Sequence, residues 1–380
     1  MISRRLIVIA AAGAWALLAA RDAAPESHFI AKQYSRCSTC HYKPTGGGLL
    51  TPYGRALSKQ EISTWGRTPE GAEPTGGLRE EEFLFGVLSR WLEDAPIDLG
   101  IDLRPSRLEM DLGGRESERN FWMRADLEVA VRAGGWTGYA ELGRYPSANP
   151  ELISREHWVG YAWDNGTAIR AGRFLPPFGL NATDHTSYNR RTIGFDQDDQ
   201  IYGVAFSDSG ERHLFEAFIG PGRAESLYDD DGSASWTGGG RVQLEFGPKN
   251  QLVFSGLFRA PNDFQPQQWL GSVAWGFAPT HRLTFWSELD SRAQTGWKGT
   301  PEYVLYNRTS FEVYRGVWLH FAPQLNTELA NISGGTSRLQ VGAQFLPRPH
   351  WDFNVVWTRE RDRRSGFVVK TLVWQLHMYL

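Results

Sequence analysis

The chain has few cysteines, few methionines and no long apolar run beyond its first residues. Its 380 residues include only two cysteines and four methionines. So few cysteines exclude a fold that is stapled by disulfides. After residue 20, no segment has the roughly 18 consecutive apolar residues that a membrane-spanning helix needs, which excludes helical spans. The net charge of −3 shows no excess of basic residues, so no nucleic-acid partner is expected.

Aromatic residues and glycine are abundant. The chain contains 16 Trp, 13 Tyr, 21 Phe and 41 Gly, yet its mean hydropathy is only −0.41. This combination is typical of an outer-membrane β-barrel, in which only alternate residues of each strand meet lipid.

Both cysteines belong to one motif, Cys37-Ser38-Thr39-Cys40-His41. This spacing predicts the covalent attachment of one haem c, because the two thiols can add to the two haem vinyl groups. His41 then lies beside the ring and is the predicted axial ligand of the iron. The alternatives are a redox dithiol or half of a zinc site. However, no second cysteine pair completes a zinc ligand set, and the βαβ setting of a thioredoxin-like site is absent.

Composition divides the chain into three segments. Residues 1–20 read as a signal peptide, because Arg4 and Arg5 precede an apolar run that ends in small residues. Residues 21–96 are polar, rich in Gly and Pro, and carry the haem motif, with a turn at 42–48 and a short helix at about 52–63. This cytochrome c-like segment has little apolar material, so haem would have to supply much of its core. Residues 97–380 are the predicted barrel.

Period-2 alternation dominates the third segment. Apolar residues, expected to face lipid, alternate with polar residues, expected to line a water-filled lumen. The apolar set includes Phe121, Met123, Leu127 and Val129. Trp122 and the candidate lumen residues Arg124, Asp126, Glu128, Glu288 and Asp290 belong to the polar-face set.

About sixteen strands are expected. Their centres fall near residues 105, 126, 141, 158, 170, 203, 215, 241, 254, 272, 286, 307, 320, 341, 355 and 372. A soluble sandwich would show the same alternation, so the connections must decide. Short turns such as 133–135 alternate with longer polar connections such as 229–232 and 359–362. Short periplasmic turns, long extracellular loops and an even strand count indicate an all-β transmembrane barrel in a bacterial outer membrane.

The third long connection, about Pro176 to Asp198, is the longest. By its position we expect it to fold into the lumen and narrow it. Asp184, Arg190 and Arg191 are then candidate constriction residues. The alternative is an ordinary solvated loop.

The whole architecture resembles the fused outer-membrane cytochrome–porins, best known from iron-oxidising bacteria. The resemblance in residues rests on the stretch from His28 to Gln33, which leads into Cys37–His41. It implies electron transfer across the outer membrane through a haem held in or at the barrel, with the N-terminus periplasmic or inside the lumen. The implied partners are outer-membrane lipid, a periplasmic carrier such as a soluble cytochrome, and an extracellular metal or redox substrate such as ferrous iron.

The sixth iron ligand and the function class stay open. Residues 21–95 contain no methionine, so His28 is the candidate distal ligand within the segment. The alternatives are a barrel histidine, water or an open position. Two other functions are consistent with the motif: a diffusion porin with a haem-bearing plug or sensor, and a peroxidase-like haem enzyme. No arrangement of nucleophile, histidine and acid indicates any other catalytic activity.

Overall fold

The structure is a computed structural model. It describes residues 27–34, 36–65, 96–144, 152–180, 186–193, 199–223, 235–262, 266–295, 301–328 and 331–380. The predicted signal peptide lies outside these residues. Among them, no helix is both long and apolar enough to cross a membrane.

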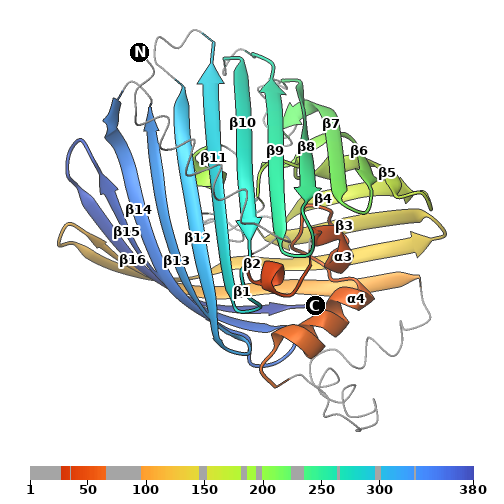
Figure 1. The fold of residues 1–380 in the computed structure, drawn as a ribbon, viewed down its shortest axis with the longest axis horizontal. Helices are drawn as coiled ribbons and strands as arrows, with labels where there is room; N and C mark the ends of the chain where they lie inside the picture. The colour runs from red at the N-terminus through yellow and green to blue at the C-terminus, as the bar shows by residue number, and fades with distance from the viewer. Residues whose placement is uncertain are drawn as a thin grey trace.

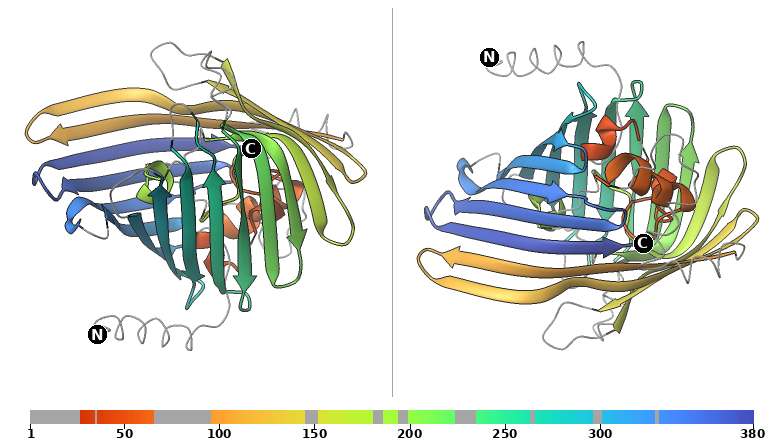
Figure 2. Two further views of the ribbon diagram at one scale, coloured as in Figure 1. Left: turned by 90° about the horizontal axis from the view of Figure 1, so that it is seen from above. Right: turned by 90° about the horizontal axis from the view of Figure 1, so that it is seen from below.

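Sixteen antiparallel strands form one closed barrel, in which every strand pairs with its neighbours in sequence and β1 pairs with β16 (Figures 1 and 2). Each predicted strand centre falls inside a different strand, so the predicted fold class is confirmed. The strands are β1 Ile97–Leu112, β2 Glu116–Ala133, β3 Trp136–Arg144, β4 Leu152–Ala162, β5 Thr167–Phe174, β6 Ile201–Ser209, β7 His213–Arg223, β8 Thr237–Glu245, β9 Asn250–Arg259, β10 Gln268–Phe277, β11 Leu283–Gln294, β12 Glu302–Tyr314, β13 Val317–Glu328, β14 Asn331–Phe345, β15 Trp351–Asp362 and β16 Val368–Tyr379.

Alternation along the strands separates an apolar exterior from a polar interior. On β2, Leu127 is 55% exposed, whereas its neighbours Asp126 and Glu128 are buried. On β11, Leu289 is exposed between buried Glu288 and Asp290. Exposed apolar side chains on the outside of a closed barrel are those that meet lipid.

One part of the predicted alternation is wrong. The register of β1 and β2 shifts between Arg104 and Pro105, which makes Met123 an extra residue on β2. Such a bulge reverses the faces on its far side. Trp122, predicted to face the lumen, is therefore 48% exposed, and Phe121 lies opposite Ser106, whose side chain is buried. Met123, predicted to face lipid, accepts a hydrogen bond from Gln375 Nε2 at 2.8 Å.

The connections follow the predicted pattern at one barrel end and less regularly at the other. Both ends of the strand order, β1 and β16, begin and finish at the end that carries turns such as 134–135 and 315–316. At the opposite end the longest connection is 175–200, but β1 and β2 are joined by only 113–115. Residues 359–362, predicted to form a loop, belong to β15, in which Arg359, Glu360 and Arg361 pair with Lys370, Val369 and Val368 of β16.

Residues 27–34 and 36–65, called the plug here, occupy the barrel at the end with the short turns (Figure 2). They form α2 Ser27–Ala31, α3 Cys37–Cys40, α4 Pro52–Leu57 and the π-helix η1 Ser58–Ile62. The helix expected at about 52–63 is thus observed as α4 and η1. Thr51 caps it, because its Oγ1 accepts a hydrogen bond from Gly54 N at 3.1 Å.

The buried core lies between the plug and the barrel wall. Ile30 and Leu57 of the plug belong to one apolar cluster with Trp286 and Trp318. Leu49 belongs to a second cluster with side chains from the wall and from the connection 175–200. The plug therefore provides apolar packing that the polar inner face of the barrel would otherwise lack.

Candidate functional site

A chamber inside the barrel brings the sequence motif together with the lumen wall. It is open to solvent and is lined by the plug, the barrel wall and the connection 175–200. The plug contributes Cys37, Cys40 and His41 to its lining. The connection 175–200 contributes residues 175–180 and Arg190 from the other side. The chamber is thus bounded by the plug towards the short turns and by this connection towards the opposite end.

The single helical turn α3 positions the two cysteines. It begins at Cys37 and ends at Cys40, so both thiols reach the chamber from one helical turn. The two cysteines form no disulfide; Cys37 is half-buried and Cys40 is buried. Burial raises the pKa of the Cys40 thiol to about 11, which keeps it protonated at neutral pH. No group of three or more His, Cys, Asp or Glu side chains in the described ranges is placed to hold a metal ion.

His41 is oriented by the loop that follows it. Its Nδ1 lies 3.2 Å from the carbonyl oxygen of Gly48. When Nδ1 donates to that carbonyl, Nε2 is the ring nitrogen that can bind a metal, as in most metal-binding histidines. Three backbone hydrogen bonds fix the loop: His41 N to Cys37 O at 2.9 Å, Tyr42 N to Leu49 O at 3.0 Å and Thr51 N to Cys40 O at 2.8 Å.

Buried and half-buried ion pairs attach the plug to the wall. Lys43 Nζ lies 2.6 Å from Glu141 and 3.4 Å from Glu156, which are lumen residues of β3 and β4. Burial alone would lower the pKa of Lys43, but these carboxylates overcome it and the pKa is raised. Lys32 pairs with Glu312 of β12 at 2.7 Å and Arg36 with Glu245 of β8 at 3.0 Å. The plug is therefore bound to several sides of the barrel.

Glu288 anchors the connection 175–200 to the wall. Its Oε1 accepts hydrogen bonds from Leu180 N at 2.9 Å and Ser272 Oγ at 2.8 Å, and its Oε2 accepts one from Asn189 Nδ2 at 2.5 Å. Asn189 belongs to the helical turn α7 Tyr188–Arg191, which contacts β11, β12 and β13. The connection thus folds into the lumen, as its length and position predicted.

The predicted lumen residues lie in two separate groups. Arg124, Asp126 and Glu128 share the inner face of β2, whereas Glu288, Asp290 and Arg190 lie at the inserted connection. Glu128 was expected to meet water; instead it is fully buried near Lys43 of the plug. Asp184 lies outside the described residues, as do the side chains of Arg191 and His28.

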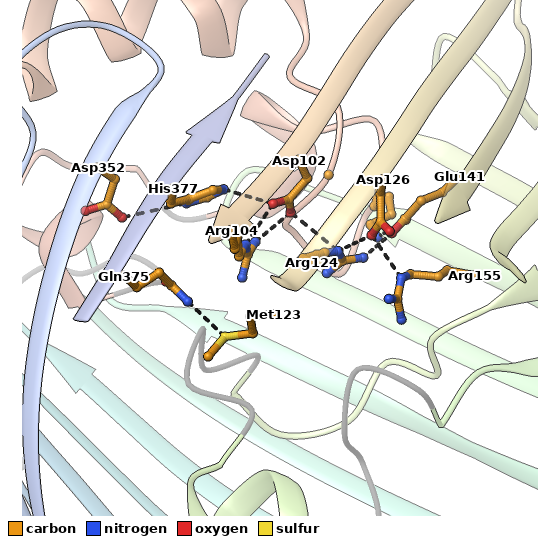
Figure 3. Close-up of polar contacts among 12 residues, drawn as sticks. Asp102, Arg104, Met123, Arg124, Asp126, Glu141, Arg155, Asp352, Gln375 and His377 are labelled. Carbon is orange, nitrogen blue, oxygen red and sulfur yellow. Dashed lines mark hydrogen bonds and ion pairs between the residues drawn. The ribbon is translucent and has the colours of Figure 1, made fainter. Parts of the chain in front are cut away.

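A charged network across the wall was not found from the sequence (Figure 3). Arg124 bonds to Asp126 and Glu141, and Asp126 Oδ2 also accepts from Arg155 Nε at 2.9 Å. The network extends through Asp102 to His377 and Asp352. The alternation along β2 indicated that Arg124 and Asp126 share one face. The pairing of neighbouring strands was needed to show that the other charges meet them. The members not predicted are Lys43, Asp102, Arg104, Glu141, Arg155, Glu156, Asp352 and His377.

Comparisons with family models and with curated proteins gave no match. Among solved structures, the chain is similar to the anion-selective porin from Comamonas acidovorans, with a TM-score of 0.58 and 10% identity over 75% of this chain and 99% of that one. It is also similar to Salmonella typhi OmpF in complex with daunomycin, with a TM-score of 0.57 and 12% identity over 75% and 97%. The outer-membrane channel DcaP of Acinetobacter baumannii gives 0.53 and 10% over 75% and 97%.

These likenesses identify the porin fold. A closed sixteen-strand barrel with an apolar exterior belongs to the proteins of the bacterial outer membrane, so the predicted location is confirmed. The porin half of the resemblance to fused cytochrome–porins is confirmed with it. The cytochrome half stays a prediction.

Proposed function

We propose that this chain is an outer-membrane electron-transfer protein that carries one haem c inside its barrel. The observation that carries the proposal is that Cys37, Cys40 and His41 all line one chamber within the lumen. In this reading Cys37 and Cys40 attach the haem, and His41 is its axial ligand.

The residues present fit such a group in two ways. The two thiols come from one helical turn, and the His41 imidazole has its Nδ1 directed to a carbonyl. When bound, the haem supplies an iron that exchanges one electron, at a potential set by its ligands and burial. His28 remains the candidate for the second axial position; Phe29, next to it in α2, lines the chamber.

The two ends of the chamber suggest the two redox partners. The plug lies at the end that carries the barrel termini, which is the periplasmic end in this class. A periplasmic carrier, such as a soluble cytochrome, would approach that end. An extracellular donor, such as ferrous iron or another redox substrate, would approach past the connection 175–200.

Diffusion of small solutes is the second candidate, favoured by the porin fold itself. The plug and the inserted connection oppose it, because each occupies part of the lumen. The peroxidase-like reading has no observation in its favour among the described side chains.

The proposal is tested in liposomes that contain the protein in their membrane and a soluble cytochrome inside. An electron donor is added outside, and reduction of the enclosed cytochrome is followed by its absorbance. The wild type and Ser38→Ala, which keeps both cysteines and His41, should reduce the enclosed cytochrome. The double variant Cys37→Ala/Cys40→Ala should not. Equal reduction by all three proteins would mean that the donor diffuses through the pore, and would replace electron transfer by the porin reading.

A further inference from the structure

Two arginines stand side by side on the chamber wall. In the register of β1 and β2, Arg104 lies directly opposite Arg124. Both line the chamber that Cys37, Cys40 and His41 also line. Like charges at directly opposite positions of neighbouring strands destabilise a sheet, so this pairing has a cost that calls for a reason.

Carboxylates hold each guanidinium in place (Figure 3). Arg104 donates to Asp102 through Nε at 2.8 Å and through Nη2 at 2.7 Å. Arg124 donates through Nε to Asp126 and through Nη2 to Glu141. In both residues the remaining nitrogen, Nη1, has no hydrogen-bond partner in the part of the chain that the structure describes. The carboxylates thus fix the orientation of both guanidinium groups, and Nη1 of each remains able to donate a hydrogen bond to a ligand.

We propose that Arg104 and Arg124 form a subsite for an oxyanion in the chamber. Paired guanidinium groups suit carboxylate and phosphate oxygens, which accept charge-assisted hydrogen bonds in the plane of the fork. Two sources have this chemistry: the propionate carboxylates of a haem attached at Cys37 and Cys40, which rests on the proposed function, and a free anion such as phosphate.

The first arm of the test uses protein without haem. Phosphate is titrated calorimetrically, at constant ionic strength, into Cys37→Ala/Cys40→Ala and into wild-type chain produced without haem-ligation enzymes, which guards against misfolding of the variant. Phosphate should bind both proteins, and Arg104→Gln or Arg124→Gln should weaken it by about tenfold or more, as expected for loss of a charge-assisted hydrogen bond. The control is Arg107→Gln, on the same strand but paired with Glu109 and Glu118 at the surface; it should leave the affinity unchanged.

The second arm uses the haem-loaded protein and identifies the source. If propionates occupy the subsite, phosphate binding disappears on haem attachment, and Arg104→Gln lowers the reduction potential relative to Arg107→Gln. If a free anion is the natural occupant, phosphate binds the loaded and haem-free proteins alike. Either result supports the subsite.

The subsite is overturned if haem-free protein binds no phosphate, or binds it equally well after both arginine substitutions. A chain that never takes up haem would refute the proposed function while leaving the first arm intact, so the two failures are distinguishable.

Discussion

Three consecutive glycines set the position of His41. Gly46, Gly47 and Gly48 have φ values of 84°, 72° and 66°, a region that residues with a Cβ rarely adopt. They return the chain so that the Gly48 carbonyl faces the His41 ring. Gly47 and Gly48 differ in their surroundings. A Cβ on Gly48 would lie 2.7 Å from Tyr139 Oη, whereas a Cβ on Gly47 would meet nothing within 4 Å.

This difference predicts unequal costs for the same substitution. Gly47→Ala pays only for the left-handed backbone, roughly 1–2 kcal/mol. Gly48→Ala adds overpacking against Tyr139 and Lys43, roughly 1–3 kcal/mol more, and displaces the carbonyl that orients His41. Denaturant unfolding in detergent measures the costs, and the absorption spectrum of the loaded protein reports the iron ligand. Equal stabilities and equal spectra would show that the Gly48 carbonyl does not hold His41.

Residues differ in how far the sequence alone could predict their roles. The spacing of Cys37, Cys40 and His41 is a local pattern, so it can be recognised in the sequence without knowledge of the fold. Lys43 looked like an ordinary turn residue, and its burial between Glu141 and Glu156 depends on strands about a hundred residues away. Arg104 could not be singled out either, because the role proposed for it depends on Arg124, which lies opposite it on the neighbouring strand.

At the scale of the strand, β2 carries the clearest contrast between lipid and interior. Leu127 points outward and is 55% exposed, while the adjacent Glu128 is fully buried and neither carboxylate oxygen has a hydrogen-bond partner among the described residues. Strand positions were predictable because period-2 alternation and turn residues are both local. The bulge at Met123 was not, since an extra residue becomes visible only when the partner strand is known.

Substitutions on the two faces of β2 should therefore behave differently. Leu127→Arg should destabilise the barrel by roughly 2–4 kcal/mol if it lies near the bilayer midplane. Glu128→Gln should cost little, because Gln has nearly the same shape and neither carboxylate oxygen of Glu128 accepts a hydrogen bond among the described residues. Denaturation in lipid vesicles measures both changes, with Leu127→Phe as an apolar control. A small cost for Leu127→Arg would mean that this face does not meet lipid.

At the scale of the whole molecule, the plug and barrel act as one unit. Neither alternation nor composition could place residues 27–65 inside the lumen, because polar, glycine-rich segments look the same in a plug and in an external domain. The placement depends on ion pairs with distant strands, among them Lys32 with Glu312 and Lys43 with Glu141.

Loss of these pairs should loosen the plug and open the pore. Breaking a fully buried pair costs roughly 3–5 kcal/mol. These two pairs should cost less each, because Lys32 is partly exposed and Glu141 keeps its bond to Arg124. We expect the wild type to conduct ions poorly in a planar bilayer and Lys32→Ala/Lys43→Ala to conduct several times more. Lys59→Ala is the control, since Lys59 forms no side-chain ion pair within the described segments. Porin-like conductance in the wild type would contradict an obstructed lumen.

The covalent haem is the central claim, and acid–acetone extraction tests it most directly. The wild-type chain is produced with haem-ligation enzymes, purified and extracted, and its intact mass and visible spectrum are then recorded. One haem should remain on each polypeptide, and Cys37→Ala/Cys40→Ala should carry none. A wild-type polypeptide that loses all its haem to the solvent, or never held any, would contradict the account.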